Sequence, residues 1–181
     1  MIDQLKHELA EKDAAEIIHF ISSNYADRTV FSTSFGIEDQ VLIHLLAQAN
    51  SKINIFTLDT GRLFPETYYV WNRTLARYGL AIQSYFPNTA EVERLVTVKG
   101  PSSFYESVEN RKECCFIRKI EPLSRAIKGY DIWITGIRAD HSPNREEMEY
   151  IEWDAHNNIL KIHPLFHWNL ADVEEFLKVN N

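Results

Sequence analysis

Cysteine is scarce in this sequence: the 181 residues contain two, Cys114 and Cys115, and these are adjacent. A disulfide between sequence neighbours is strained, because its geometry favours a larger separation of Cα atoms than one peptide unit comfortably allows. A secreted scaffold held together by disulfides is therefore excluded. Metal ligation, redox chemistry and simple burial of two small thiols remain as roles for the pair.

Basic charge and long apolar runs are also lacking. Lysine and arginine total 19 against 26 aspartates and glutamates, and the formal net charge is -7. This balance disfavours non-specific binding to nucleic acid or to an anionic membrane. No run approaches the roughly 20 apolar residues that span a bilayer, and the charged Asp3, Lys6 and Glu8 are unlike a signal or transit peptide. We therefore expect a soluble, cytoplasmic protein with neither a nucleic-acid nor a membrane partner.

The hydrophobic pattern predicts one α/β domain over residues 1–181, since 45% hydrophobic residues are ample for a core. Strand-like and helix-like segments alternate, which predicts a mostly parallel sheet with helices on both faces. Strands are expected at residues 29–32, 53–58, 82–86 and 131–137, with an edge pair at 148–153 and 159–163. Helices are expected over residues 1–23 with a break near 13, around 41–46, at 65–78, 90–98 and 116–128, and after Asn169.

The loop after the first strand is a candidate anion site. Residues 32–36 are followed by Glu38 and Asp39 in the first helical turn. Backbone N–H groups at such a turn point outward together and can hold an anion. An ordinary P-loop needs a lysine after the last glycine, and none is present. On these residues alone, a simple turn that caps a helix is slightly favoured.

Four blocks of sequence, taken in order, resemble the motifs of the APS/PAPS reductase family, which acts on adenylyl sulfate (APS) or its 3'-phosphorylated relative (PAPS). The blocks are Ser32-Thr33-Ser34-Phe35-Gly36-Ile37-Glu38-Asp39-Gln40, residues 58–67, Lys112-Glu113-Cys114-Cys115 with residues 118–123, and residues 133–138 followed by Ser142-Pro143. The resemblance covers residues 28–177. It implies the adenine-nucleotide alpha-hydrolase-like fold with a modified P-loop, in a chain that lacks the family's C-terminal cysteine segments.

The same resemblance implies that Cys114 and Cys115 are ligands of a [4Fe-4S] cluster. We expect the pair at the start of a helix, where N–H dipoles and nearby cations would stabilise thiolates. These cations are Arg111, Lys112, Arg118 and Lys119. A protein-bound cluster normally takes four thiolates and this sequence has two, so the others would come from sequence not given or another chain, or no cluster forms. Zinc faces the same shortage.

The resemblance also implies a set of substrate-binding residues at the carboxyl ends of the strands, where ligands of such sheets bind. These residues are Ser32, Thr33, Ser34, Gly36, Asp39, Leu58, Thr60, Gly61, Arg62, Lys119, Gly136 and Arg138. Lys119 would support the reaction electrostatically, and Arg138 would offer its planar fork to a sulfate or phosphate. A solvated lysine and a structural ion pair are the respective alternatives.

The implied reaction is reduction of APS to sulfite and AMP with a thioredoxin- or glutaredoxin-like donor. No catalytic nucleophile is identifiable, because the resemblance commits both cysteines to iron. We therefore expect this chain by itself to bind nucleotide without turnover, and a homo-oligomer is left open. Three alternatives remain: a PAPS reductase, an ATP-pyrophosphatase-type adenylating enzyme, and a non-enzymatic nucleotide- or metal-binding module.

Overall fold

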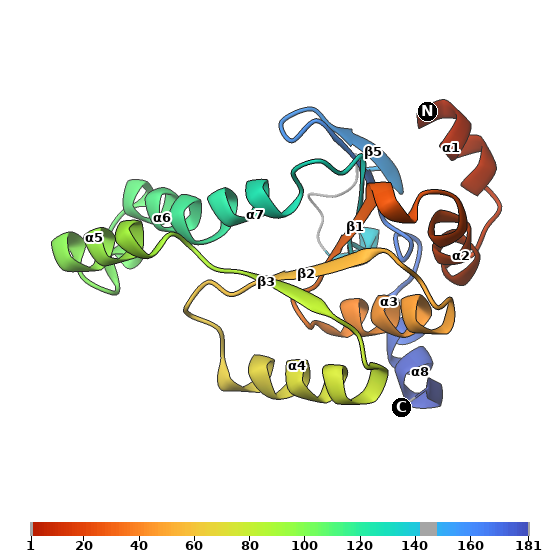
Figure 1. The fold of residues 1–181 in the computed structure, drawn as a ribbon, viewed down its shortest axis with the longest axis horizontal. Helices are drawn as coiled ribbons and strands as arrows, with labels where there is room; N and C mark the ends of the chain where they lie inside the picture. Colours follow the sequence, from red (N-terminus) through yellow and green to blue (C-terminus); the bar gives the residue numbers. More distant parts are fainter. Residues whose placement is uncertain (1, 142–147, 181) are drawn as a thin grey trace.

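A six-stranded sheet forms the centre of the molecule in the order β3-β2-β1-β4-β6-β5 (Figure 1). The structure, a computed structural model, describes residues 2–141 and 148–180. All neighbouring strands pair in parallel except β5, which lies antiparallel to β6 at one edge. The strands are β1 (Thr29–Ser32), β2 (Asn54–Leu58), β3 (Ile82–Tyr85), β4 (Ile132–Ile134), β5 (Ile151–Asp154) and β6 (Ile159–Ile162). The predicted mostly parallel sheet and its edge pair are confirmed.

Helices connect these strands as the alternating pattern predicts. They are α1 (Ile2–Leu9), α2 (Ala14–Asn24), α3 (Ile37–Gln48), α4 (Pro65–Tyr78), α5 (Thr89–Lys99), α6 (Val108–Cys115), α7 (Glu121–Ala126) and α8 (Leu170–Asn180). Three short 3-10 turns at Ala26–Arg28, Ser103–Tyr105 and Ala139–His141 link them. A π-helical turn at Phe116–Ile120 joins α6 to α7. Within the described residues, no helix is both long and apolar enough to cross a membrane.

Both faces of the sheet are buried, because successive residues of a strand point to opposite faces. Phe31 of β1 belongs to the larger core, together with side chains of α1, α2, α3 and α8. Its neighbour Val30 belongs to a smaller core with Phe56 and with Ala126 of α7. Helices therefore cover both faces, as predicted, and the strands are held rigidly enough for the loops at their ends to form a defined site.

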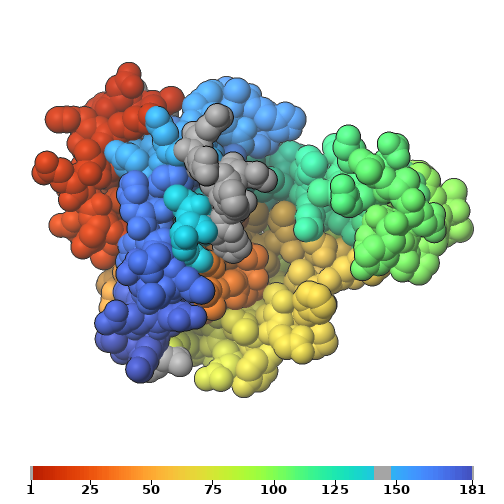
Figure 2. Space-filling view, turned by 180° about the vertical axis from the view of Figure 1, so that it is seen from behind, coloured from red at the N-terminus to blue at the C-terminus, as the bar shows by residue number. Residues whose placement is uncertain are grey.

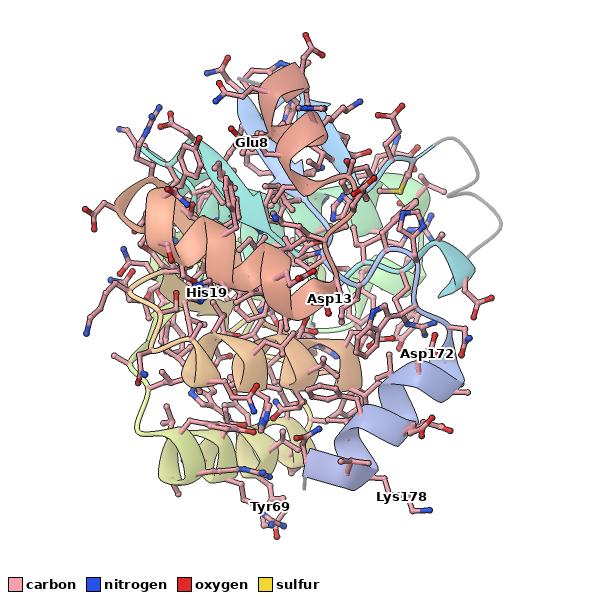
Figure 3. All side chains as sticks on the ribbon, turned by 90° about the vertical axis from the view of Figure 1, so that its right-hand side faces the viewer. Glu8, Asp13, His19, Tyr69, Asp172 and Lys178 are labelled. Carbon is pink, nitrogen blue, oxygen red and sulfur yellow. The ribbon has the colours of Figure 1, made fainter. Side chains whose placement is uncertain are left out.

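Local capping explains the break between the first two helices. Asp13 accepts a hydrogen bond from the Glu16 backbone N–H at 2.9 Å, and the Glu16 carboxylate accepts one from the Asp13 N–H at 2.9 Å. This reciprocal capping box fixes the start of α2, where Figure 3 shows Asp13. At the other end of the chain, Asn169 accepts from the Asp172 N–H at 3.1 Å and caps α8 as expected.

Two predicted boundaries are wrong. The helix predicted at residues 116–128 begins at Val108, because the Ser107 hydroxyl accepts from the Asn110 N–H at 3.1 Å and caps α6. The strand predicted at residues 131–137 is β4, which ends at Ile134, so residues 135–138 form a loop. Ser142 and Pro143 of the fourth motif lie outside the described residues.

An arm made of α5, the turn at Ser103–Tyr105 and α6 projects from the body of the molecule (Figure 1, and at the right of Figure 2). An ion-pair cluster joins its two helices: Glu113 of α6 accepts from Lys99 at 2.6 Å and from Arg94 at 3.3 Å, both on α5. These cations lower the pKa of the Glu113 carboxyl, the Lys99 hydrogen bond most strongly. The cluster therefore holds the helix that carries the cysteine pair against its neighbour.

Candidate nucleotide site

A cavity of about 480 Å³ opens at the carboxyl ends of β1, β2 and β4. Its polar lining comes from hydroxyls, from the carboxylates of Glu38 and Asp39, and from one ammonium group, that of Lys119. Its apolar lining comes from Phe56, Leu58, Leu63, Leu123, Trp133 and Ile137. Ligand pockets combine largely apolar walls with a few placed polar groups, and this mixture suits a flat base with an attached sugar and anion.

The first loop is held in shape by Asp39, a buried carboxylate in the first turn of α3. Asp39 accepts from the Ser34 backbone N–H at 2.6 Å and from the Ser34 hydroxyl at 2.8 Å. Burial raises the pKa of the Asp39 carboxyl, although the Ser34 bonds oppose the shift. The next residue, Phe35, takes a left-handed conformation with φ of 64°. In this structure the loop therefore directs both Ser34 donors inward, to Asp39.

The second loop follows β2 and is organised by another buried acid. The Asp59 carboxylate accepts from the Gly61 N–H at 2.8 Å and from the Tyr68 hydroxyl at 2.8 Å. Gly61 has φ of +70°, a conformation that glycine adopts at little cost. Thr60 lines the cavity, and its carbonyl accepts from the buried Arg118 guanidinium at 2.7 Å.

The cysteine segment lies close to this site, but not with the predicted local geometry. Cys114 and Cys115 are the last two residues of α6 and are followed directly by further helical turns, so they lie within a continuous helical segment and not at the start of a helix. The expectation that helix N–H dipoles stabilise the thiolates is therefore wrong. Both side chains are partly exposed and form no disulfide. Among the described residues, no group of three or more His, Cys, Asp and Glu could hold a metal ion.

A π turn directly after the pair aims two cations at the site. The Glu121 N–H donates to the Phe116 carbonyl five residues earlier, which defines the wide turn. Arg118 is 8% exposed and reaches the second loop, whereas Lys119 is exposed and lines the cavity. Such π turns occur frequently at functional sites, and here the turn connects the cysteine pair directly to the cavity.

The loop after β4 (residues 135–138), which we call the fourth loop after the fourth sequence motif, packs tightly against the first. A Cβ built on Gly136 would lie 2.5 Å from Asp39 Oδ1, a separation shorter than Cβ atoms show in real structures. Arg138 is 4% exposed, and its guanidinium bonds Glu38 at 2.9 and 3.0 Å and Asp140 at 3.4 Å. Under the loop, the Thr135 hydroxyl and His163 Nδ1 share a hydrogen bond of 2.7 Å.

The structure gathers most of the predicted binding residues around one cavity. Those that line it are Ser32, Thr33, Ser34, Asp39, Leu58, Thr60, Lys119 and Gly136. Gly36 and Gly61 shape the two loops. Arg62 points elsewhere: it donates to the Pro101 carbonyl at 2.7 Å and stacks 4.8 Å from the Phe104 ring centroid. The Arg138 guanidinium is bonded to Glu38 and does not line the cavity. Substrate contact remains a prediction for every one of these residues.

Sequence reasoning missed the apolar wall except for Leu58. Trp133 is the largest of these residues, and its indole N–H donates to the Ser32 hydroxyl at 2.9 Å. The Lys161 ammonium lies over the Trp133 ring, 5.2 Å from its centroid, in a cation–π contact. Alternation along β4 could have indicated it, because Ile132 and Ile134 point into the larger core and Trp133 between them must face the other side.

Comparison with known proteins agrees with this geometry. The chain is 42% identical over 176 residues to "Adenosine 5'-phosphosulfate reductase" of Neisseria meningitidis, covering 96% of this chain and 71% of the relative. It is 37% identical to the protein of that name from Agrobacterium fabrum, covering 96% and 66%, and 42% identical to that from Allochromatium vinosum, covering 84% and 59%. The chain thus spans between 59% and 71% of the length of these relatives.

Solved structures show the same fold. The crystal structure of phosphoadenylyl-sulfate (PAPS) reductase from Candida auris, a phosphate complex, superposes with a TM-score of 0.83 and 26% identity over 99% of this chain and 85% of that one. Candida glabrata FMN adenylyltransferase in complex with ATP shares the fold alone, with a TM-score of 0.58 and 19% identity over 97% and 55%. These neighbours confirm the adenine-nucleotide alpha-hydrolase-like fold.

A family model described as the phosphoadenosine phosphosulfate reductase domain matches residues 28–181, a range that contains the three loops and the π turn around the cavity. The chain belongs to the phosphoadenosine phosphosulfate reductase domain family, whose named relatives are oxidoreductases.

Proposed function

We propose that this chain forms the nucleotide-binding body of an adenylyl-sulfate reductase of sulfate assimilation, which reduces APS to sulfite and AMP. The observation that carries the proposal is the cavity itself, with Lys119 as the cationic group of its lining and with the cysteine pair on the same continuous helical segment. The names of relatives at about 40% identity support APS as the substrate. A nearby ammonium would offset the charge of a phosphosulfate without closing the site to the nucleoside.

In the proposed reaction a thiolate attacks the sulfur of APS and AMP leaves as the S–O bond breaks. The resulting S-sulfocysteine is then reduced by a dithiol of a thioredoxin- or glutaredoxin-like protein, which becomes a disulfide as sulfite departs. The contribution of this chain is to bind the nucleotide and to offset charge, which are orientation and electrostatic effects. Neither cysteine is assigned as the nucleophile, because both are proposed to bind iron.

The residues present supply half of a cluster site. Two adjacent, partly exposed thiols could donate two of the four thiolates of a [4Fe-4S] cluster. The other two would have to come from residues outside this sequence or from a second chain, and no step is derived through the cluster. When bound, a cluster would place further charge beside Lys119. Measuring iron and acid-labile sulfide after anaerobic reconstitution tests this part: four equivalents of iron held firmly by the monomeric chain would contradict a half site, and no iron bound under any condition would contradict the cluster assignment.

Nucleotide binding is tested with the 181-residue chain by tryptophan fluorescence, because Trp133 lines the cavity. AMP and APS should change the emission saturably, and the change should shrink strongly in Trp133→Phe. The matched control is Trp153→Phe, whose ring is 45% exposed on the edge strand β5. Absence of a saturable change with either nucleotide, confirmed by calorimetry, would refute the proposed site.

Substrate preference and turnover are tested separately. PAPS reductase is the second candidate, favoured by the Candida auris structure. Competition should show APS displacing bound AMP at lower concentration than PAPS does, and the reverse order would favour the second candidate. We expect no sulfite release from this chain by itself with reduced thioredoxin, and steady sulfite release would refute the assignment of both cysteines to iron.

A further inference from the structure

Arg118 connects two parts of the site that the sequence places far apart. It follows Cys115 by three residues, yet its Nη1 donates to the Thr60 carbonyl at 2.7 Å across the cavity edge. Thr60 lines the cavity, whereas Arg118 is 8% exposed and lies behind it. A contact that immobilises the Thr60 loop therefore also restrains Arg118 and the π turn that carries it. The π turn in turn adjoins the cysteine pair of α6.

Two further features show that this contact is built in. Nη1 lies 3.2 Å from the position that a Cβ on Gly61 would take, so glycine leaves the guanidinium its room. Arg118 Nε is buried and has no hydrogen-bond partner within the described part of the chain. A buried donor on a charged group that lacks a partner carries an uncompensated desolvation cost. A buried donor without a partner calls for an explanation beyond packing, and a functional role is one such explanation.

We propose that Arg118 is a positioning residue that couples occupancy of the cavity to the cysteine pair. Nucleotide contacts at Thr60 hold the second loop, the loop carbonyl holds the guanidinium, and the π turn then restrains its junction with α6, where Cys114 and Cys115 lie. Local opening at this junction would expose the partly buried side chains further, so a restrained junction shields the thiols. The inference rests on the proposed nucleotide-binding function. Linkage makes the coupling reciprocal in direction: modification of the cysteine pair should weaken nucleotide binding.

The test measures alkylation of Cys114 and Cys115 by iodoacetamide in the reduced 181-residue chain, with peptide mass spectrometry as the readout. Saturating AMP should slow the initial rate at least about fivefold, the lower end of typical coupling between sites. In Arg118→Met the rate should no longer respond to AMP, although AMP still binds. The matched control is Arg111→Met, which removes the same charge from an exposed position on α6 and should keep the full response.

The outcomes separate this inference from the function on which it rests. If AMP binds but wild-type alkylation is unchanged, or if Arg118→Met keeps the full response, the coupling is overturned and the nucleotide site stands. If neither AMP nor APS binds, both proposals fall. Should Arg118→Met fail to fold, Arg118→Lys keeps one cationic donor, and its AMP response should be at least about twofold smaller than that of the wild type. An unchanged response in Arg118→Lys would also overturn the coupling.

Discussion

Replacing Gly136 by alanine should disrupt the site through a single methyl group. The new Cβ would lie 2.5 Å from Asp39 Oδ1 and 3.2 Å from Glu38 Cβ, so either the carboxylate or the fourth loop must move. The carboxylate cannot turn freely, because its other oxygen accepts both Ser34 bonds at 2.6 and 2.8 Å. Relief of the clash therefore weakens the bonds that shape the first loop.

The size of the effect follows from these two contributions. Forcing an extra methyl into a packed site costs about 1–3 kcal/mol. A hydrogen bond to a charged group contributes about 1.5–3 kcal/mol. The site can relieve the clash of the methyl group only by weakening the Ser34–Asp39 hydrogen bonds, so the two costs do not add in full. We therefore expect the free energy of unfolding to fall by about 2–4 kcal/mol. Displacement of the loop should also weaken AMP binding at least about tenfold, which corresponds to about 1.4 kcal/mol.

Urea unfolding followed by far-ultraviolet circular dichroism measures the stability, and calorimetric titration of AMP measures the affinity. Gly36→Ala is the matched control in the first loop, against which the Gly136 loop packs, since a Cβ there would meet its nearest atoms at 3.6 and 3.7 Å, which is ordinary contact. The φ of -64° at Gly36 also suits alanine. Alanine is a weaker N-cap for α3 than glycine, so the substitution should lower the free energy of unfolding by less than about 1 kcal/mol. If Gly136→Ala unfolds at the urea concentration of the wild type and binds AMP as tightly, the argument from close approach is refuted.

Three further perturbations test other parts of the site. Arg138→Met should lower the free energy of unfolding by about 3 kcal/mol, because it leaves the Glu38 carboxylate without its buried guanidinium partner, and urea unfolding that matches the wild type would contradict this. His163→Leu should cost about 1–3 kcal/mol by leaving the buried Thr135 hydroxyl without that partner, and the double variant with Thr135→Val should recover part of the loss in the same assay. Burial would raise the pKa of Asp154, but hydrogen bonds from Lys161 and Asn157 prevail and lower it from 3.8 to about 2. A depressed carboxyl pKa stabilises the fold above the unfolded value, so Asp154→Asn should cost about 1–2 kcal/mol at neutral pH and nothing once the pH falls through about 2. A pH-independent difference would show that proton linkage is not the cause.

The sequence predicts the sheet well because its strands are buried on both faces, which leaves short apolar runs between turn signals. It predicts the cysteine helix poorly because residues 108–115 carry almost no apolar periodicity, with no buried residue in α6. There the start of the helix depends on a single Ser107 cap. The π turn could not be predicted, since residues 116–120 show no local signal that distinguishes it from an ordinary helix.

Identities of the binding residues were easier to predict than their orientations. The motifs give Arg62 and Arg138 the same weight as Lys119, and all three are cations beside the same strand ends. Tertiary contacts separate them: Arg62 stacks on Phe104 of the arm, and Arg138 pairs with Glu38. Phe104 and Glu38 lie far from their arginine partners in the sequence, so the spacing of residues within a motif cannot predict these contacts.

These orientations bear on how a nucleotide would lie in the cavity. The first loop brings two carboxylates to the start of α3, but Glu38 is bonded by Arg138 and Asp39 by Ser34. Neither the Ser34 donors nor the Arg138 guanidinium is therefore aimed at an incoming anion. Among the described lining residues, Lys119 is the cation that faces the cavity. Since an anion favours the region of positive charge and an aromatic base favours the apolar wall, we infer that the phosphosulfate end lies toward Lys119 and the cysteine segment, with the base toward Trp133.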